Sequence, residues 1–359
     1  MAKSGQHGGN VLQMAERYGL APDSILDFSA NINPLGMPAS LKQAIVDNLT
    51  LAEHYPDIDY QRLHAALARH IGCSPRAVLA GNGATELIFA LTHYLRPKKA
   101  MLPVPGFAEY RRALERESCD IVNYTLHEAD DYQPTAALLD ALTPDLDCLF
   151  LCTPNNPTGQ QPPQALLLQI LDRCRELQIT LIVDESFIDF LPGQTGLTAS
   201  LNDYPNLFIL RSLTKFFAIP GLRLGYLLSS DMQAIDTMRD QREPWTINAF
   251  AALAGETVLD DRGYIQQTHH WLQAEQEYLY QALSQFSELK VWRPAANYIF
   301  IRNQQTELNL QDELLRHHLL IRHCANYPGL SDQHYRVAIK SHENNQQLVA
   351  ALKQVFGHG

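Results

Sequence analysis

The chain has 359 residues, of which 46% are hydrophobic and 19% charged, which is typical of a globular protein large enough for two packed domains. Its formal net charge of −11 argues against a nucleic-acid partner, because binding a phosphate backbone needs a basic face. No apolar run reaches about 18 residues and the first residues contain no apolar signal core, so we expect a cytoplasmic protein with no membrane partner.

The six cysteines and fourteen histidines have no spacing typical of a metal site. The cysteines are scattered without a CxxC pair, which favours reduced thiols over a disulfide framework or a zinc site. The pairs His269–His270 and His317–His318 lie in polar, helix-like stretches, where adjacent residues do not share a face. We therefore expect no bound metal.

Apolar strands alternate with helical patterns from about residue 40 to 230, which predicts an α/β fold with a mainly parallel sheet and helices on both faces. Helices are expected at 85–94, 107–117, 163–177 and 234–241, and strands at 99–103, 120–124, 148–152, 179–184, 207–211 and 224–229. The rest of the chain predicts helices at 247–259 and 263–286 and then a smaller α+β domain. Its expected strands are 290–293, 298–302, 320–323 and 335–340, and its helices 308–317 and 344–355.

Gly83, Ala84 and Thr85 precede or begin the first of these helices. Free backbone N–H groups at a helix N-terminus, together with the Thr85 hydroxyl, can bind a phosphate. The same residues would equally form an ordinary capped helix. Both interpretations stay open at this point.

Two apolar strands end in polar residues that suit a ligand site. The strand at 148–152 leads into an Asn/Pro/Gly turn that contains Asn156, and the strand at 179–184 ends in Asp184. In α/β proteins ligands bind beyond the carboxyl ends of strands. There Asn156 can donate to a ring oxygen, and an ionised Asp184 can keep a pyridine nitrogen protonated. The alternatives are an ordinary turn and a surface or helix-capping acid.

Lys215 is preceded by the hydroxyls of Ser212 and Thr214, and Arg223 follows eight residues later beside an apolar strand. A lysine amine can bond covalently to the aldehyde of pyridoxal 5'-phosphate (PLP), while hydroxyls and a guanidinium hold its phosphate. A solvated loop lysine and a strand-edge salt bridge are the alternatives. The order of Asn156, Asp184 and Lys215 along the chain favours a PLP site.

These motifs resemble those of the fold-type-I, aspartate-aminotransferase-like superfamily of PLP enzymes over nearly the whole chain. The segments at 7–10, 26–36, 105–110 and 324–330 are similar to the threonine-phosphate decarboxylase family of cobalamin biosynthesis, whose close relative is histidinol-phosphate aminotransferase. The resemblance implies a large PLP-binding domain at 40–250 with a seven-stranded type of sheet. It also implies a small α+β domain at 251–359, with an N-terminal arm, 1–39, packed on it.

The resemblance further implies which residues contact the cofactor from outside the lysine motif. Phe107 matches an aromatic residue that stacks on the pyridine ring. Tyr55 matches a tyrosine that reaches the cofactor phosphate of the neighbouring subunit, which implies a homodimer with shared sites. Phe187 stands where many aminotransferases carry a tyrosine, so a second hydrogen bond to the ring oxygen is expected to be missing.

The substrate implied by the resemblance is a small phosphorylated amino acid. Arg336 matches the bidentate clamp for the α-carboxylate, a geometry that suits a guanidinium. Arg322 matches the residue that holds the distal phosphate. Further substrate contacts are implied for His7, Gly8, Asn31 and Asn156.

The expected reaction is PLP-dependent decarboxylation of L-threonine O-3-phosphate to (R)-1-amino-2-propanol O-2-phosphate, with Lys215 and Asp184 as the catalytic residues. The same residues would also serve an aminotransferase acting on a phosphorylated amino acid such as histidinol phosphate. A third possibility is a PLP-binding regulator without turnover, which the intact lysine, aspartate and arginine set disfavours.

Overall fold

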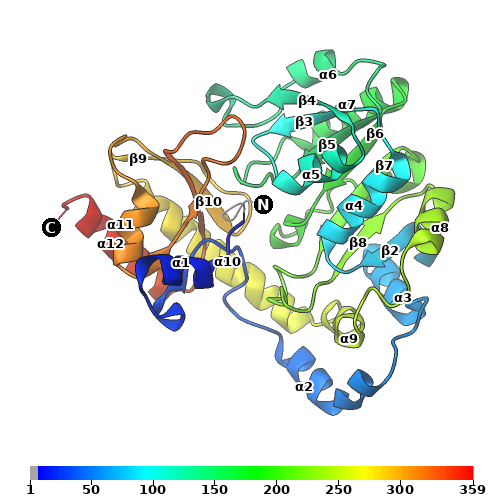
Figure 1. Cartoon of the computed structure of the whole chain (residues 1–359), viewed down its shortest axis with the longest axis horizontal. Helices are drawn as coiled ribbons and strands as arrows, with labels where there is room; N and C mark the ends of the chain where they lie inside the picture. The colour runs from blue at the N-terminus through cyan, green and yellow to red at the C-terminus, as the bar shows by residue number, and fades with distance from the viewer. Residues whose placement is uncertain (1–6, 359) are drawn as a thin grey trace.

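A computed structural model of the chain describes residues 7–358. Seven strands form its larger sheet, in the order β2-β8-β7-β6-β5-β3-β4, and the five from β7 to β4 run parallel (Figure 1). Their bounds are β2 Val78–Gly81, β3 Lys99–Val104, β4 Asp120–Thr125, β5 Cys148–Cys152, β6 Thr180–Asp184, β7 Leu207–Ser212 and β8 Gly225–Leu228. The predicted α/β fold with a mainly parallel sheet is therefore confirmed.

Helices bury their apolar stripes against both faces of this sheet. One face packs against α4 (Ala84–Leu95), α5 (Ala108–Arg116) and α8 (Met232–Gln241). The other face carries α3 (Gln61–Ile71), α6 (Ala137–Ala141) and α7 (Gln164–Glu176). Strands covered on both sides are apolar over most of their length, as in β5 and in residues 207–210 of β7.

A four-stranded antiparallel sheet forms the second unit, in the order β12-β13-β10-β9. Its strands are β9 Leu289–Val291, β10 Tyr298–Asn303, β12 Arg322–His323 and β13 His334–Ala338, and its helices are α10 Arg262–Leu283, α11 Leu310–Arg316 and α12 His342–Val355. The 22-residue α10 extends along this unit toward the seven-stranded one (Figure 1).

The N-terminal segment packs on the four-stranded unit. Helix α1 (Val11–Tyr18) buries Met14 and Ala15 against Leu315 and Leu320. Strand β1 (Leu26–Asp27) pairs in parallel with β11 (Leu319–Leu320). The single strand expected at 320–323 is therefore wrong, because Leu320 pairs with β1 whereas Arg322 pairs with β13.

Two further helices, α2 (Ala39–Asp47) and α9 (Ala249–Val258), pack against each other beside α3. The boundary expected at 250–251 falls inside the first turn of α9, and the three-part division of the chain stays a prediction.

Short 3-10 helices complete the connections: η1 Pro22–Ser24, η2 Leu49–Glu53, η3 Pro75–Ala77, η4 Glu128–Asp130, η5 Ile188–Phe190 and η6 Thr198–Asp203. Among residues 7–358, no helix has the length and apolarity needed to span a bilayer.

Candidate active site

The carboxyl ends of β5, β6 and β7 open into a cavity of about 570 Å³. Asn156 follows β5, Asp184 ends β6 and Lys215 follows β7, and all three line this cavity. These strands are neighbours in the sheet, so residues far apart in sequence meet at one edge. The structure thus brings together the three motifs on which the sequence argument rests.

The Lys215 amine sits in a desolvated position. Its Nζ lies 3.3 Å from the Ser212 hydroxyl and 5.0 Å from the centroid of the Phe187 ring. Burial lowers the pKa of Lys215; the Asp184 carboxylate opposes this shift, and the positive charge of Arg223 adds to it. A lysine with a lowered pKa is more often a neutral amine, the form that attacks an aldehyde.

Asp184 is 5% exposed and is held by two donors. The Tyr110 hydroxyl donates to Oδ2 at 2.6 Å, and the backbone N–H of Ser186 donates to Oδ1 at 2.9 Å. Burial, together with the nearby Asp184 carboxylate, raises the pKa of Tyr110 well above its usual range, so that its hydroxyl remains a donor. These two bonds fix Asp184 at the cavity wall, where it can face a protonated ring nitrogen.

The start of α4 forms a tight anion cradle. Gly83 is the N-cap residue with φ 83°, and a Cβ on it would lie 2.3 Å from Nη2 of Arg223. Ala84, Thr85 and Arg223 all line the cavity. The helix N-terminus and the guanidinium therefore converge on one point, which favours an anion site over an ordinary helix cap.

Hydroxyls close the other side of this cradle. The Oγ of Ser212 and the Oγ1 of Thr214 lie 2.8 Å apart, and both residues line the cavity and are buried. Backbone N–H groups, two hydroxyls and a guanidinium make up a donor set that suits a phosphate dianion. The residues present therefore fit the phosphate of PLP.

Phe107 and Asn156 flank the remaining space. Phe107 caps α5 and lines the cavity, with its ring 5.6 Å from that of Tyr110. The side-chain oxygen of Asn156 accepts from Arg336 and, at 3.4 Å, from the Tyr327 hydroxyl. Because that oxygen accepts from two protein donors, the amide N–H₂ is the group left to donate to a ligand; donation to the cofactor stays a prediction.

Arg336 lies on β13 with 5% of its surface exposed, and it lines the cavity. Its Nη2 donates to the backbone oxygen of Ser29 at 2.8 Å, and its guanidinium carbon lies 5.4 Å from the Tyr298 ring centroid. Its Nε is buried without a hydrogen-bond partner in the described part of the chain. A buried unsatisfied donor is costly, and a ligand carboxylate would satisfy it.

The N-terminal segment contributes His7, Gly8 and Asn31 to the cavity lining. Asn31 is 5% exposed, and its side-chain oxygen has no partner among residues 7–358. The predicted substrate contacts of this segment thus lie in the same cavity as Lys215.

Two predicted residues lie elsewhere. Within residues 7–358, Arg322 is not among those that line the cavity. Its guanidinium donates to the His323 backbone oxygen at 2.7 Å and to Oδ1 of Asn326 at 2.8 Å. The guanidinium carbon lies 5.4 Å from the centroid of the Tyr327 ring. It therefore stands behind Tyr327, which does line the cavity. Tyr55 is 79% exposed and stacks on Trp245 at 4.5 Å, so it does not line the cavity of its own chain either.

Sequence reasoning missed Tyr110 and Tyr327 as site residues. Tyr110 follows Phe107 at a spacing of three residues on a helix, which places both on one face. That spacing was a usable signal for Tyr110. For Tyr327, the only signal was its place in the segment 324–330.

Comparison with known proteins agrees with this geometry. The sequence pattern described as "Aminotransferase class I and II" matches residues 23–352. The chain belongs to the class I and II aminotransferase family. Within this family, it is 55% identical over 98% of its length, and 96% of the relative's, to the threonine-phosphate decarboxylase of Salmonella typhimurium.

Two further proteins are similar to the chain over most of its length. One is the adenosylcobalamin biosynthesis bifunctional protein CobDQ of Leptospira interrogans, 31% identical over 98% of this chain and 41% of that protein. The other is the crystal structure of the histidinol-phosphate aminotransferase from Clostridium acetobutylicum, 30% identical with a TM-score of 0.88, covering 93% of this chain and 100% of that one.

Proposed function

We propose that this chain decarboxylates L-threonine O-3-phosphate to (R)-1-amino-2-propanol O-2-phosphate, in the aminopropanol arm of cobalamin biosynthesis. The observation that carries the proposal is the 55% identity, over 98% of the chain, to a threonine-phosphate decarboxylase. The relative named for adenosylcobalamin biosynthesis supports the pathway. The cavity agrees with a doubly anionic substrate, because Arg336 and His7 both line it.

The family's cofactor is PLP, and the cavity has a group for each of its polar parts. Lys215 would bind the aldehyde, Asp184 would pair with the ring nitrogen, and the cradle of Gly83, Thr85 and Arg223 would hold the phosphate. When bound, PLP supplies an electron sink for cleavage of a bond at the substrate Cα.

The chain's own residues decide which bond is cleaved. Arg336 binds the substrate carboxylate, while His7 and Asn31, which line the cavity, bind the phosphate; Arg322 stands behind Tyr327. With both anions held, rotation of the substrate is restricted, and the Cα–carboxylate bond can be kept in the orientation that breaks. The substrate amine would first displace Lys215 from the aldehyde, and the freed Nζ would take up the proton of the substrate ammonium. As CO₂ leaves, this Nζ donates the proton to Cα, so that hydrogen takes the place of the carboxylate.

Release of CO₂ without an acceptor tests this proposal. Purified protein with PLP and L-threonine O-3-phosphate is expected to release one CO₂ per amine product in the absence of any 2-oxo acid. If no CO₂ appears under these conditions, the proposed reaction is wrong.

A second candidate is transamination of a phosphorylated amino acid such as histidinol phosphate. The observation that favours it is the TM-score of 0.88 to a histidinol-phosphate aminotransferase. An aminotransferase needs a 2-oxo acid acceptor and releases no CO₂, whereas a PLP-binding regulator would do neither. The same assay, run with and without 2-oxoglutarate and with histidinol phosphate as the alternative substrate, therefore separates these functions.

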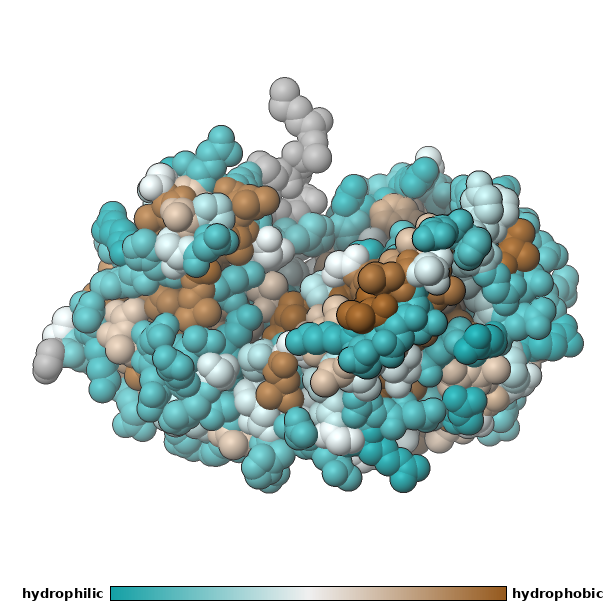
Figure 2. Space-filling model, turned by 90° about the horizontal axis from the view of Figure 1, so that it is seen from below, coloured by the Kyte–Doolittle hydropathy of each residue, from teal (hydrophilic) through white to brown (hydrophobic). Residues whose placement is uncertain are grey.

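We also propose that the enzyme is a homodimer in which Tyr55 completes the site of the second subunit. Tyr55 and Trp245 stack on each other although 79% and 44% of their surfaces are exposed, and Val46, Leu49 and Ile58 are also exposed. Figure 2, which views the molecule from the side of α2, shows apolar patches that interrupt the hydrophilic surface. A second copy packed on these side chains would bury them.

The cytoplasmic location expected from the sequence is likewise a proposal. Its support is that all six cysteines are free thiols in the structure, five of them buried. Reduced thiols suit a reducing compartment.

A further inference from the structure

We infer that Glu109 is a positioning residue that seats His7, and with it a strap formed by residues 7–10, across the cavity. The inference rests on the proposed function, in which His7 binds the substrate phosphate. Glu109 itself does not line the cavity; it acts through His7, which does.

The burial of Glu109 needs an explanation that its own helix does not supply. Glu109 lies in the first turn of α5, where an acid is favoured by the helix dipole, but only 4% of it is exposed. Nη1 of Arg112 lies 2.9 Å from both of its oxygens, yet the Arg112 side chain is 55% exposed. Such a local pair is usual on a surface. A buried carboxylate needs further partners.

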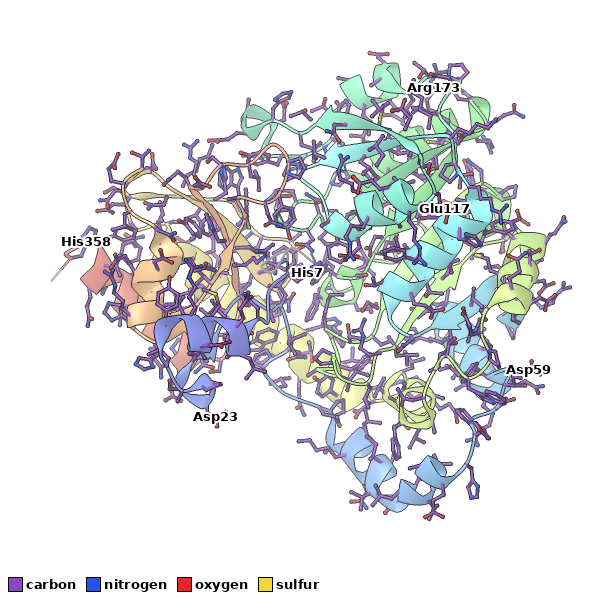
Figure 3. All side chains as sticks on the ribbon, viewed as in Figure 1. His7, Asp23, Asp59, Glu117, Arg173 and His358 are labelled. Atoms are coloured by element: carbon purple, nitrogen blue, oxygen red, sulfur yellow. The ribbon has the colours of Figure 1, made fainter. Side chains whose placement is uncertain are left out.

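His7 is that further partner, and it comes from 102 residues away. Its Nε2 lies 2.8 Å from Oε1 of Glu109, and its ring lies 5.8 Å from that of Phe107. In Figure 3, His7 lies where the seven-stranded and four-stranded units face each other. Glu109 therefore ties the N-terminal segment to the seven-stranded unit.

The other side of the strap is tied to Ser29, just after β1. The backbone N–H of Gly9 donates to Oγ of Ser29 at 2.8 Å, and a Cβ on Gly8 would lie 2.0 Å from the Ser29 backbone oxygen. That same oxygen accepts from Arg336. Residues 7–10 thus bridge the two units, with the proposed carboxylate clamp at one end and Glu109 at the other.

The bond to Glu109 also orients the His7 imidazole. A carboxylate accepts, so Nε2 carries a hydrogen, and Nδ1 is the ring nitrogen that, when it also carries a hydrogen, can donate to a phosphate oxygen. The His7 side chain is 48% exposed, so without Glu109 its ring would be free to rotate in the unliganded protein. Substrate binding would then have to remove that rotamer freedom. Glu109 restricts the ring beforehand, so its effect belongs in substrate binding rather than in the chemical step.

Hydrogen exchange on the PLP-loaded protein without substrate tests the strap directly. Glu109→Ala and His7→Ala are each expected to speed exchange in the peptide covering residues 7–18 by about 10-fold, with a smaller change in Glu109→Gln. Glu117→Ala is the matched control, because it removes a similar pair, His93 Nδ1 to Glu117 Oε1 at 3.0 Å, at the other end of α5. Unchanged exchange in both Glu109 variants would overturn the inference.

Kinetics separate positioning from a merely structural role. In the wild-type background, Glu109→Ala is expected to raise KM for L-threonine O-3-phosphate about 10-fold while kcat stays within about 2-fold. In a His7→Ala background, adding Glu109→Ala should change KM less than about 2-fold, because its effect acts through His7. An equal KM change in both backgrounds would refute the link through His7. If Glu109→Ala does not fold, the same comparison of wild-type and His7→Ala backgrounds is made with Glu109→Gln. A wild type that releases no CO₂ would refute the proposed function while leaving the exchange result to decide on the strap.

Discussion

Lys215 lies in a buried position that favours its neutral form, and this lowers the stability of the folded protein. Since burial lowers its pKa, the unfolded chain binds more protons than the folded one between the lowered value and the usual one near 10.5. The free energy of unfolding therefore rises with pH across that window. This penalty is the opposite of what a stabilising ion pair would give.

The first prediction follows from this penalty. In the protein without PLP, Lys215→Met should raise the free energy of unfolding at pH 7, because the variant has no charge to desolvate. The gain over wild type should shrink as the pH rises toward the usual lysine value. Urea denaturation of both proteins from pH 6 to 10 measures it, with exposed Lys98→Met as the control. A constant difference across this range would contradict the prediction.

Lys215→Ala tests the covalent link to the cofactor at the same position. Borohydride reduction of the PLP-loaded wild type should add the pyridoxyl group to the peptide that contains Lys215, as read by mass spectrometry. The variant should lose this label and at least about 1000-fold in rate. A labelled peptide elsewhere in the wild type would show that another lysine holds PLP.

Tyr110→Phe probes the support of Asp184. The change removes a donor 2.6 Å from a buried carboxylate, so we expect a loss of about 1–3 kcal/mol in the free energy of unfolding. Urea denaturation measures it, and Tyr124→Phe on β4 serves as the control because Tyr124 is only partly buried. Equal stability of the two variants would mean that the bond to Asp184 contributes nothing.

At the scale of elements, the anion cradle depends on how closely α4 approaches Arg223. Gly83→Ala should weaken PLP binding about 10-fold or more, because its Cβ would collide with the Arg223 guanidinium. Gly72→Ala is a matched control: Gly72 caps α3 with φ 82°, but nothing lies within 4 Å of its Cβ position. Absorbance titration with PLP compares the two. Similar losses in both would assign the effect to backbone strain alone.

Most elements around the site could be predicted, because each apolar run ends where a polar motif begins. The strand at 148–152 has the predicted bounds, and Asp184 ends its strand as expected. Contacts between distant segments could not be predicted. Nothing local to His7 indicates Glu109, and the pairing of β1 with β11 splits a run of residues that reads as one strand. The motif around Arg322 predicts a substrate contact, but the packing of Arg322 on Tyr327 puts it behind the cavity wall.

At the scale of the whole molecule, a shared site can be tested by mixing two inactive chains. Lys215→Ala lacks its own lysine, and Tyr55→Ala lacks the tyrosine proposed to serve its neighbour. In a hybrid dimer, one of the two sites has both residues. Refolding the variants together in equal amounts should therefore restore about a quarter of the wild-type rate, while each alone stays low. No recovery in a mixture that is dimeric by light scattering would show that Tyr55 acts within its own chain.

Arg336 donates to two protein partners, Ser29 and Asn156. In the proposed reaction, loss of CO₂ removes one of the two charges that bind the ligand, and the guanidinium is left with these two contacts. Of the two anionic groups of the proposed substrate, the product keeps only the phosphate. Turnover thus loosens its own product, and departure should begin at the end where the carbon dioxide was lost.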